Sequence, residues 1–319
     1  MKTQQKLWFK ILVDGKSCHG GSLVWSLPKM DSETGEWIPG DWHEVDGPLV
    51  MCYHPGIHLT CKPANWCDDG CSFFIAEHGD DILDNGTDKI SCRRVRLLRE
   101  ATEAELASVN VFTNGVHEFG EGVVSVCGTA RVERVYGSAR VEMVCGSARV
   151  ERVCDSARVE RVSGSARVER VSGSASVERV FGSARVVSVS DSARIGSVND
   201  SARVERVYGS ARIERVCDSA RVEMVSGSAS VGSVYESARV GSVCGSACVE
   251  RVSGSACVES VSGSSRIDSV SGSARVERVS GSANITSYSA QSSVVKPIDY
   301  AVVIDRSKVP PQIICGWSS

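Results

Sequence analysis

The sequence predicts a mainly β protein built around a parallel β-solenoid, with a small α+β N-terminal domain and a short C-terminal cap. A phrase with the consensus A-R-V-E-R-V-x-G-S recurs every nine residues from Ala130 to Ala283, eighteen times without an insertion. Each copy carries two β-branched residues, which favour a strand over a helix. Each copy also ends in Gly-Ser or a substitute, so a helix there could not exceed about two turns.

Composition changes sharply at both ends of the repeat. Residues 122–289 contain 22 Arg, 18 Asp plus Glu and no Lys, whereas the whole chain has a net charge of −3. The same stretch has no Pro, Leu or Trp. We therefore expect three parts: an α+β domain at 1–120 that also caps the rod, the solenoid at 121–289, and a C-terminal cap at 290–319.

Each copy of the repeat is interpreted as one strand and one tight turn. One column begins at Val132 and is Val or Ile in all eighteen copies, and a second begins at Val135. A single strand cannot bury these side chains, so two copies should form an 18-residue coil with two opposed strands, and the whole array about nine stacked coils. Because the two columns are three residues apart, we expect a bend or bulge at the Glu-Arg pair between them. Either the Ala or the Ser ahead of the first Val should also face inward, and the pattern does not decide between them.

The position before each Ser is the expected turn. It is Gly at twelve of the seventeen junctions. Gly suits a turn with a positive φ, and an acidic replacement adds a side chain that can bond to the backbone. The replacements are Asp155, Asp191, Asp200, Asp218 and Glu236.

The outer face of the rod is predicted to carry charged ladders. Arg131 and Glu133 are two residues apart, so they share one face of a strand, and stacked coils place Arg ladders beside Glu ladders. Two interpretations stay open: the ladders keep a β surface soluble, or repeated guanidinium forks form a binding face. The candidate interaction surface consists of Arg131, Glu133, Arg134, Arg149, Glu151, Arg152, Arg167, Glu169 and Arg170.

Between residues 176 and 260, both residues of the consensus Glu-Arg pair are replaced in four copies. They read Val187-Ser188, Gly196-Ser197, Gly232-Ser233 and Gly241-Ser242. We expect a less charged patch on the rod between residues 176 and 260. Drift within a duplicated array is the simpler explanation of this patch.

The N-terminal and C-terminal parts carry ordinary local signals. A helix is predicted at Thr102–Ser108, with Thr102 as N-cap and Glu105 closing a capping box. Two C-terminal strands are predicted around Pro310-Pro311, at Tyr300–Asp305 and Gln312–Cys315. The strand-like runs of the N-terminal part are Leu7–Val13, Ser22–Ser26, Leu49–Tyr53, Ser72–Ala76 and Lys89–Leu98.

Cysteines and histidines cluster once in the N-terminal part. Four thiolates or imidazoles could hold a tetrahedral zinc ion. The spacing matches no standard zinc module and contains no C-x2-C knuckle, so ordinary packing is the competing interpretation and no cofactor is predicted outright. The candidate metal ligands are Cys52, His54, His58, Cys61, Cys67 and Cys71.

Three segments of this part carry a family resemblance. Gly56–Trp66 reads GIHLTCKPANW, Phe74–Glu77 reads FIAE, and Arg94–Arg99 reads RVRLLR. In this order they resemble an uncharacterised N-terminal domain family of bacteriophage and bacterial proteins, in which the domain precedes nine-residue β-solenoid repeats. The resemblance covers roughly residues 5–120 and the style of the repeats. It implies the cytoplasm of a bacterial or phage-infected cell, with virion association as the alternative, and it implies no activity or catalytic residue.

These features favour a structural or interaction protein, a rigid rod that presents the N-terminal domain and binds a protein partner or self-associates. The gapless repeat has no insertion loop to carry a catalytic site. An N-terminal enzyme or zinc-binding module with the solenoid as spacer is one alternative, and weak nucleic-acid binding through the Arg ladders is another. The net charge of +4 in residues 122–289, with Glu interleaved, argues against a surface that tracks phosphates. No run approaches the ~18 apolar residues of a membrane span, so no membrane partner is predicted.

Overall fold

The structure is a computed structural model that describes residues 6–18, 23–51, 56–67, 70–287, 289 and 291–316. Residue contacts divide the chain into two compact units. One unit comprises Met1–Asn114 with Val124–Gly128, and the other comprises Gly115–Val123 with Thr129–Ser319. Each unit has its own buried core.

An antiparallel sheet forms the first unit. Its strands follow the order β5-β10-β7-β1-β6-β9-β8, with β2 paired to β1. A ribbon of β3 and β4 lies outside this sheet, and β11 and β13 pair in parallel with each other. The strands are β1 (Phe9–Val13), β2 (Lys16–Ser17), β3 (Lys29–Met30), β4 (Trp37–Ile38), β5 (His43–Glu44), β6 (Ile57–Thr60), β7 (Cys71–His78), β8 (Ile82–Asp84), β9 (Lys89–Cys92), β10 (Arg94–Glu100), β11 (Val111–Phe112) and β13 (Val123–Val126).

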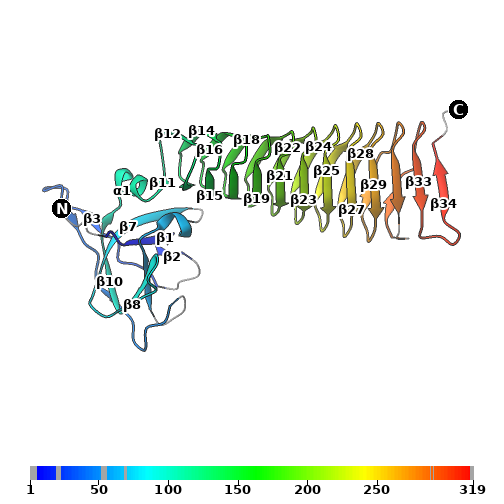
Figure 1. The fold of residues 1–319 in the computed structure, drawn as a ribbon. Coiled ribbons are helices and arrows are strands. Elements are labelled where there is room, and N and C mark those ends of the chain that lie inside the picture. The colour runs from blue at the N-terminus through cyan, green and yellow to red at the C-terminus, as the bar shows by residue number, and fades with distance from the viewer. Residues whose placement is uncertain are drawn as a thin grey trace. The chain divides into compact units, whose positions relative to one another are not determined.

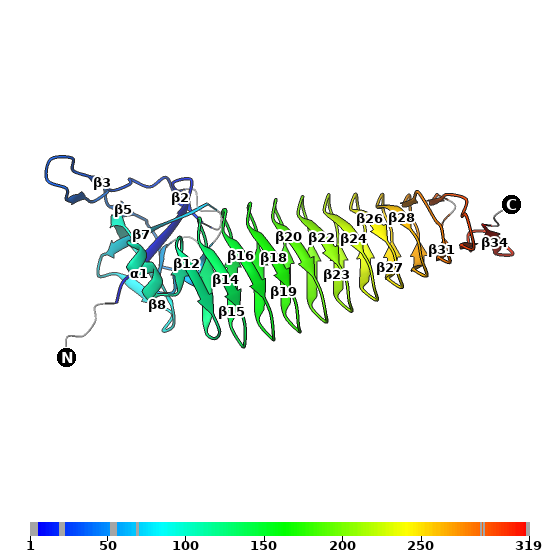
Figure 2. The ribbon, with the colours of Figure 1, turned by 90° about the horizontal axis from the view of Figure 1, so that it is seen from above.

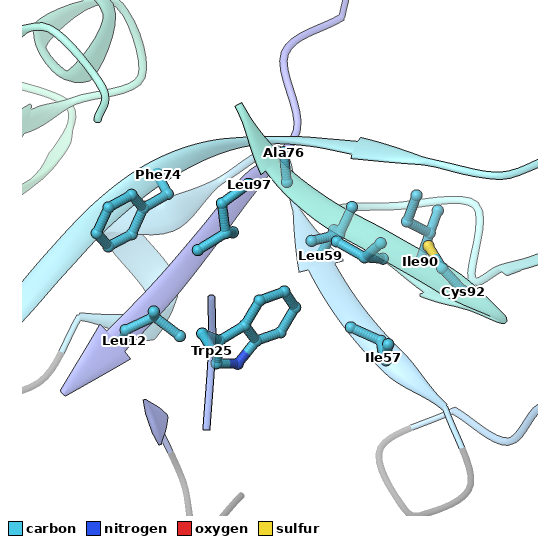
Figure 3. Packing of buried hydrophobic residues seen from close by; sticks show 10 residues of the cluster. Leu12, Trp25, Ile57, Leu59, Phe74, Ala76, Ile90, Cys92 and Leu97 are labelled. Carbon is cyan, nitrogen blue, oxygen red and sulfur yellow. The ribbon is translucent and has the colours of Figure 1, made fainter. Parts of the chain in front are cut away.

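The sheet packs an apolar cluster on one of its faces. Figure 3 shows the Trp25 ring beside Leu12 and Leu97, and the cluster also includes side chains of β6, β7 and β9. Trp25 is only 4% exposed, and its indole N–H donates to Ser17 Oγ at 3.1 Å. The indole N–H of the buried ring therefore has a hydrogen-bond partner, which avoids the desolvation cost of an unpaired N–H.

The predicted helix and most predicted strands are confirmed. Helix α1 (Glu103–Ser108) starts at the N-cap Thr102, and Glu105 completes the capping box. The run Lys89–Leu98 was predicted as one strand and is two, because Arg93 interrupts it and donates to Asp81 and the Val45 carbonyl. The prediction of a strand at Ser22–Ser26 is wrong, since the described part of this run has only an isolated β-bridge at Val24. Leu49–Met51 is not strand either, and the rest of that predicted run lies outside the described residues.

A parallel β-solenoid forms the second unit, as the repeat predicts. Figures 1 and 2 show its strands stacked in chain order, with successive strands alternating between two sheets. In the described residues, one sheet has eleven strands. They are β12 (Val116–Phe119), β14 (Arg131–Val135), β16 (Arg149–Val153), β18 (Arg167–Val171), β20 (Arg185–Val189), β22 (Arg203–Val207), β24 (Arg221–Val225), β26 (Arg239–Val243), β28 (Cys257–Val261), β30 (Arg275–Val276) and β32 (Ser293–Val294).

The opposite sheet repeats the same register. Val141 pairs with Val159, 18 residues later, and the same step recurs from strand to strand. Its strands in this unit are β15 (Arg140–Val144), β17 (Arg158–Val162), β19 (Ser176–Val180), β21 (Arg194–Val198), β23 (Arg212–Val216), β25 (Ser230–Val234), β27 (Cys248–Val252), β29 (Arg266–Val270), β31 (Asn284–Ser287), β33 (Val302–Asp305) and β34 (Gln312–Cys315). Segments outside the repeat, such as β12 and β32, add coils to the nine expected from eighteen copies.

The core of the solenoid consists of the two predicted Val columns and an Ala column. Val132 and Val135 are both fully buried although they are three residues apart, so inward and outward positions do not alternate strictly between them. The sequence did not decide whether Ala or Ser faces inward at the corner of each coil. In the structure it is Ala, since Ala130 and its equivalents are buried whereas Ser138 is exposed. Ser265 replaces Ala once and is also buried, because its hydroxyl donates to the Ser262 carbonyl at 2.6 Å.

The turns use positive φ at every predicted junction position. Gly137 has φ +61°, and Asp155, in the same place one coil later, has φ +59°. The acidic residues also bond between coils: Asp155 accepts from the Gly137 N–H at 3.2 Å, and Glu236 accepts from the Asp218 N–H at 2.8 Å. The acidic side chain thus offsets the cost of a left-handed conformation with a hydrogen bond to the preceding coil.

The C-terminal strands form as predicted. β33 pairs in parallel with β31, and β34 folds back antiparallel on β33. This hairpin ends the parallel stacking. Within the described residues, no helix is long and apolar enough to cross a membrane.

Candidate interaction surface

Two kinds of charged column run along the solenoid surface. The first Arg and the Glu of each copy belong to one kind, and the second Arg belongs to the other. Parallel pairing in register aligns each kind, as Arg131 pairs with Arg149 and Arg152 pairs with Arg170. The candidate residues named from the sequence all have exposed or half-buried side chains on β14, β16 and β18.

In most copies that carry it, the first Arg forms an ion pair with an acidic side chain. Arg149 contacts Glu169 of the next coil at 2.7 Å, and Arg131 likewise contacts Glu151. Arg167 contacts Glu169 within its own strand at 2.6 Å, and this hydrogen bond lowers the pKa of the Glu169 carboxyl. These side chains are partly solvated, so each pair stabilises the fold by only ~0–1 kcal/mol. Where these pairs form, the ladder compensates its own charge.

Two of these arginines reach across a missing Glu. Gly232 and Gly241 stand where the partner Glu of Arg212 and Arg221 would lie. Arg212 instead contacts Glu250 at 3.0 Å, and Arg221 contacts Glu259 at 3.5 Å, each 38 residues away and so two coils along. The long guanidinium side chain therefore maintains pairing where the repeat has lost its acid.

The second Arg of each copy forms a column with few acidic partners. On the eleven-stranded sheet this guanidinium column contains Arg134, Arg152, Arg170 and Arg206. Arg134 contacts Glu118 at 3.5 Å, whereas the other three form no ion pair with a described residue. On the opposite sheet the corresponding column alternates in register between arginine and serine, through Arg179, Ser197, Arg215, Ser233 and Arg251. Sequence reasoning placed both arginines of a copy in one binding face and missed this difference, because a one-dimensional repeat does not show which Arg meets a Glu of the next coil.

The candidate zinc ligands are only partly described. Cys52 and His54 lie outside the described residues. His58 is on β6 and Cys71 on β7, two strands that β1 separates in the sheet order. Cys67 is buried and its thiol donates to the Pro63 carbonyl at 3.2 Å. The described residues contain no group of three metal-ligating side chains, so the zinc site stays a prediction.

A buried lysine in the N-terminal unit was missed by sequence reasoning. Lys10, the second residue of β1, is 7% exposed; its Nζ donates to the His58 carbonyl at 3.2 Å and lies 5.1 Å from the Trp25 ring centroid. Burial lowers the pKa of Lys10 to about 8. Burial also raises the pKa of the neighbouring Cys92 thiol to about 12. The signal in the sequence is a single cation inside the apolar run FKILV.

Comparison of the chain with protein-family models, with curated proteins and with solved structures finds no match.

Proposed function

We propose that the chain is a structural or interaction protein, in which the β-solenoid is a rigid rod that binds a protein partner along its unpaired guanidinium columns and presents the N-terminal unit. The column of Arg152, Arg170 and Arg206 carries the proposal. Charges that a fold does not compensate internally remain available to carboxylates of a partner. A phage or bacterial setting is part of the same proposal and rests on the family resemblance of the N-terminal residues.

Rigidity follows from the regular interior. Stacked Val and Ala columns are fully buried from Ala130 to Ala274, and backbone bonds link each coil to the next. Each coil contacts its two neighbours, so the rod keeps identical spacing between equivalent charges. Such spacing suits a partner that presents carboxylates at regular intervals.

The unpaired column can be tested by affinity capture with the full chain as bait in a lysate of the source cell. In the column variant, Arg152, Arg170 and Arg206 become Gln, and captured proteins should be lost because the guanidinium contacts are gone. In the matched control, Arg149, Arg167 and Arg203 become Gln, which removes three charges from the same strands β16, β18 and β22. The control should retain capture, since these arginines already pair with Glu.

Equal capture by the column variant and the control would contradict a binding role for the column. Capture that nuclease treatment abolishes would instead indicate nucleic acid as the bound species, against the proposal.

Self-association is a second candidate function, favoured by the last strand of the solenoid. β34 pairs with β33 and is terminal in the sheet order of the described residues, so one backbone edge is unpaired there. Ile313 on this strand is 65% exposed, and the strand Gln312–Cys315 carries no charge. An uncharged edge strand pairs readily with an identical edge strand, because no charged side chain on it opposes such pairing.

Sedimentation velocity at several protein concentrations tests this candidate. The wild-type chain should show a concentration-dependent dimer, and Ile313→Lys should be monomeric because the added charge opposes edge pairing. Val309→Lys is the control, as Val309 is 98% exposed but lies outside the strand. A wild-type chain that stays monomeric at all concentrations, or a dimer that persists in Ile313→Lys, excludes pairing through β34.

A further inference from the structure

A recess interrupts the guanidinium column of the eleven-stranded sheet. Ser188 of β20 pairs in register with Arg170 of β18 on one side and Arg206 of β22 on the other. Serine lacks the long side chain of its neighbours, and a cavity of about 640 Å³ with both arginines in its lining opens at this point. The two arginine backbones are two coils apart, ~9.6 Å, so their side chains can reach the recess from opposite sides.

The floor of the recess is polar and closely packed. Ser188 is 4% exposed, and its hydroxyl donates to the Glu169 carbonyl at 3.1 Å, which fixes the side chain. Ser190 is 6% exposed and also lines the cavity. These short side chains give the floor hydroxyl groups without filling the space above it.

The charges around the recess leave a positive balance. Arg170 and Arg206 are exposed and form no ion pair with a described residue. Asp191 also lines the recess, but one of its oxygens already accepts the Gly173 N–H at 3.0 Å. Two guanidinium groups and one carboxylate make a net charge of about +1 at neutral pH, which suits a singly charged anion.

The size and one wall of the recess indicate a ligand larger than a bare ion. A volume of about 640 Å³ lies within the ~300–1,000 Å³ of small-molecule sites and exceeds what a single oxyanion fills. Tyr208, 41% exposed, contributes an aromatic wall against which a ring can lie. The free oxygen of Asp191 can accept from a hydroxyl of the same ligand.

We propose that this recess is a binding site for a small hydroxylated ring molecule that carries one singly charged oxyanion, either a carboxylate or a sulfate ester. Arg170 and Arg206 hold the oxyanion, Asp191 and Ser190 bind hydroxyl groups, and Tyr208 packs against the ring. The arginines act as forks because a guanidinium matches the geometry of an oxyanion with two parallel N–H donors. The site shares Arg170 and Arg206 with the proposed protein-binding column, but its test uses the chain alone and requires no protein partner.

Isothermal titration of the full chain with defined probes tests the site. Glucuronate and glucose 6-sulfate present the same ring with a carboxylate or a sulfate, glucose lacks the anion, and acetate and inorganic sulfate lack the ring. A charged ring should bind at least about tenfold more tightly than glucose and than its bare anion, because both parts of the recess are used. The preferred charged ring identifies the oxyanion.

Two serine-to-arginine variants provide the structural control. Ser188→Arg restores the column and fills the recess, so binding should fall by at least about tenfold. Ser242→Arg makes the same change in the same column, where Met224 and Ser260 are the in-register neighbours and Ser242 makes a similar bond to the Glu223 carbonyl. Both variants should fold, because Arg170 and Arg206 already occupy this position in other coils.

Arg206→Gln provides a second measurement that keeps the shape of the recess. This substitution should weaken the binding of the charged ring by about tenfold and leave any weak binding of glucose unchanged. The proposal is overturned if no charged ring binds in the millimolar range, or if Ser188→Arg binds as well as Ser242→Arg. It is also overturned if glucose binds as tightly as the charged rings.

Discussion

Val204→Asp should break the solenoid in its middle. Val204 is fully buried in β22 and pairs in register with Val186 and Val222. A carboxylate there enters a core of Val, Ile and Ala side chains with no donor to receive it, so the free energy of unfolding should fall by at least about 4 kcal/mol. Because the backbone pairing of each coil is with its two neighbours, the damage should open the rod locally at this coil.

Trypsin digestion followed by mass spectrometry measures this opening. The solenoid contains 22 Arg in residues 122–289. In the intact rod most of them lie on paired strands, which cannot enter the active site of a protease. Val204→Asp should be cleaved first near Arg203 and Arg206. Val204→Ile is the control and should resist trypsin like the wild type, since Ile195 and Ile213 already occupy this column. If Val204→Asp resists cleavage equally, the proposed dry core is wrong.

Lys10→Met should stabilise the N-terminal unit at neutral pH and remove part of its pH dependence. The ordinary pKa of lysine, 10.5, falls to about 8 when Lys10 is buried, mainly through desolvation. At ~1.36 kcal/mol for each pH unit, the buried charge costs about 3 kcal/mol at pH 7. Replacement by methionine removes this cost along with the bond to the His58 carbonyl, so we expect a net gain of about 2 kcal/mol.

The sign of the pH dependence follows from proton binding. Between pH 8 and 10.5 the folded unit has released the Lys10 proton while the unfolded chain retains it, so stability rises with pH in this range. From pH 7 to 9 the wild type should therefore gain about 1 kcal/mol that Lys10→Met does not. Cys18, Lys89 and Cys92 also act on Lys10. Cys92 has its own pKa raised from 9.0 to about 12 and works in the opposite direction, since it lowers stability above pH 9.

Guanidinium unfolding followed by tryptophan fluorescence measures this effect at pH 7, 8 and 9. Five of the six tryptophans, Trp8, Trp25, Trp37, Trp42 and Trp66, lie in the N-terminal unit, so the fluorescence reports mainly on this unit. Lys16→Met removes an exposed lysine from the adjacent strand β2 and should keep the pH slope of the wild type. Equal slopes for Lys10→Met and Lys16→Met would falsify the buried-charge interpretation.

Local chemistry made the solenoid predictable from the sequence. A nine-residue period with β-branched pairs and Gly or Asp at the turn leaves stacking as the way to bury each strand. The 18-residue register, the positive φ at Asp155 and its equivalents, and the two Val columns all follow from that period. The capping box at Thr102 was predictable for the same reason, since it involves residues three apart in the chain.

The N-terminal unit was harder to predict because its contacts are not periodic. β1 lies between β6 and β7, partners about 50 and 60 residues away along the chain, and no local pattern identifies them. Lys10 is buried where residues distant in the chain, His58 and Trp25, lie against its side chain.

In the solenoid, the sequence by itself determined the strands, the turns and the columns, since each depends on a residue and its near neighbours. The tertiary structure decided that Ala130 rather than a serine fills the corner, and that Arg149 pairs with Glu169 of the next coil while Arg170 forms no ion pair with a described residue. It also decided that the space above Ser188 is open. These outcomes depend on the direction of side chains between coils, which a linear repeat leaves undetermined.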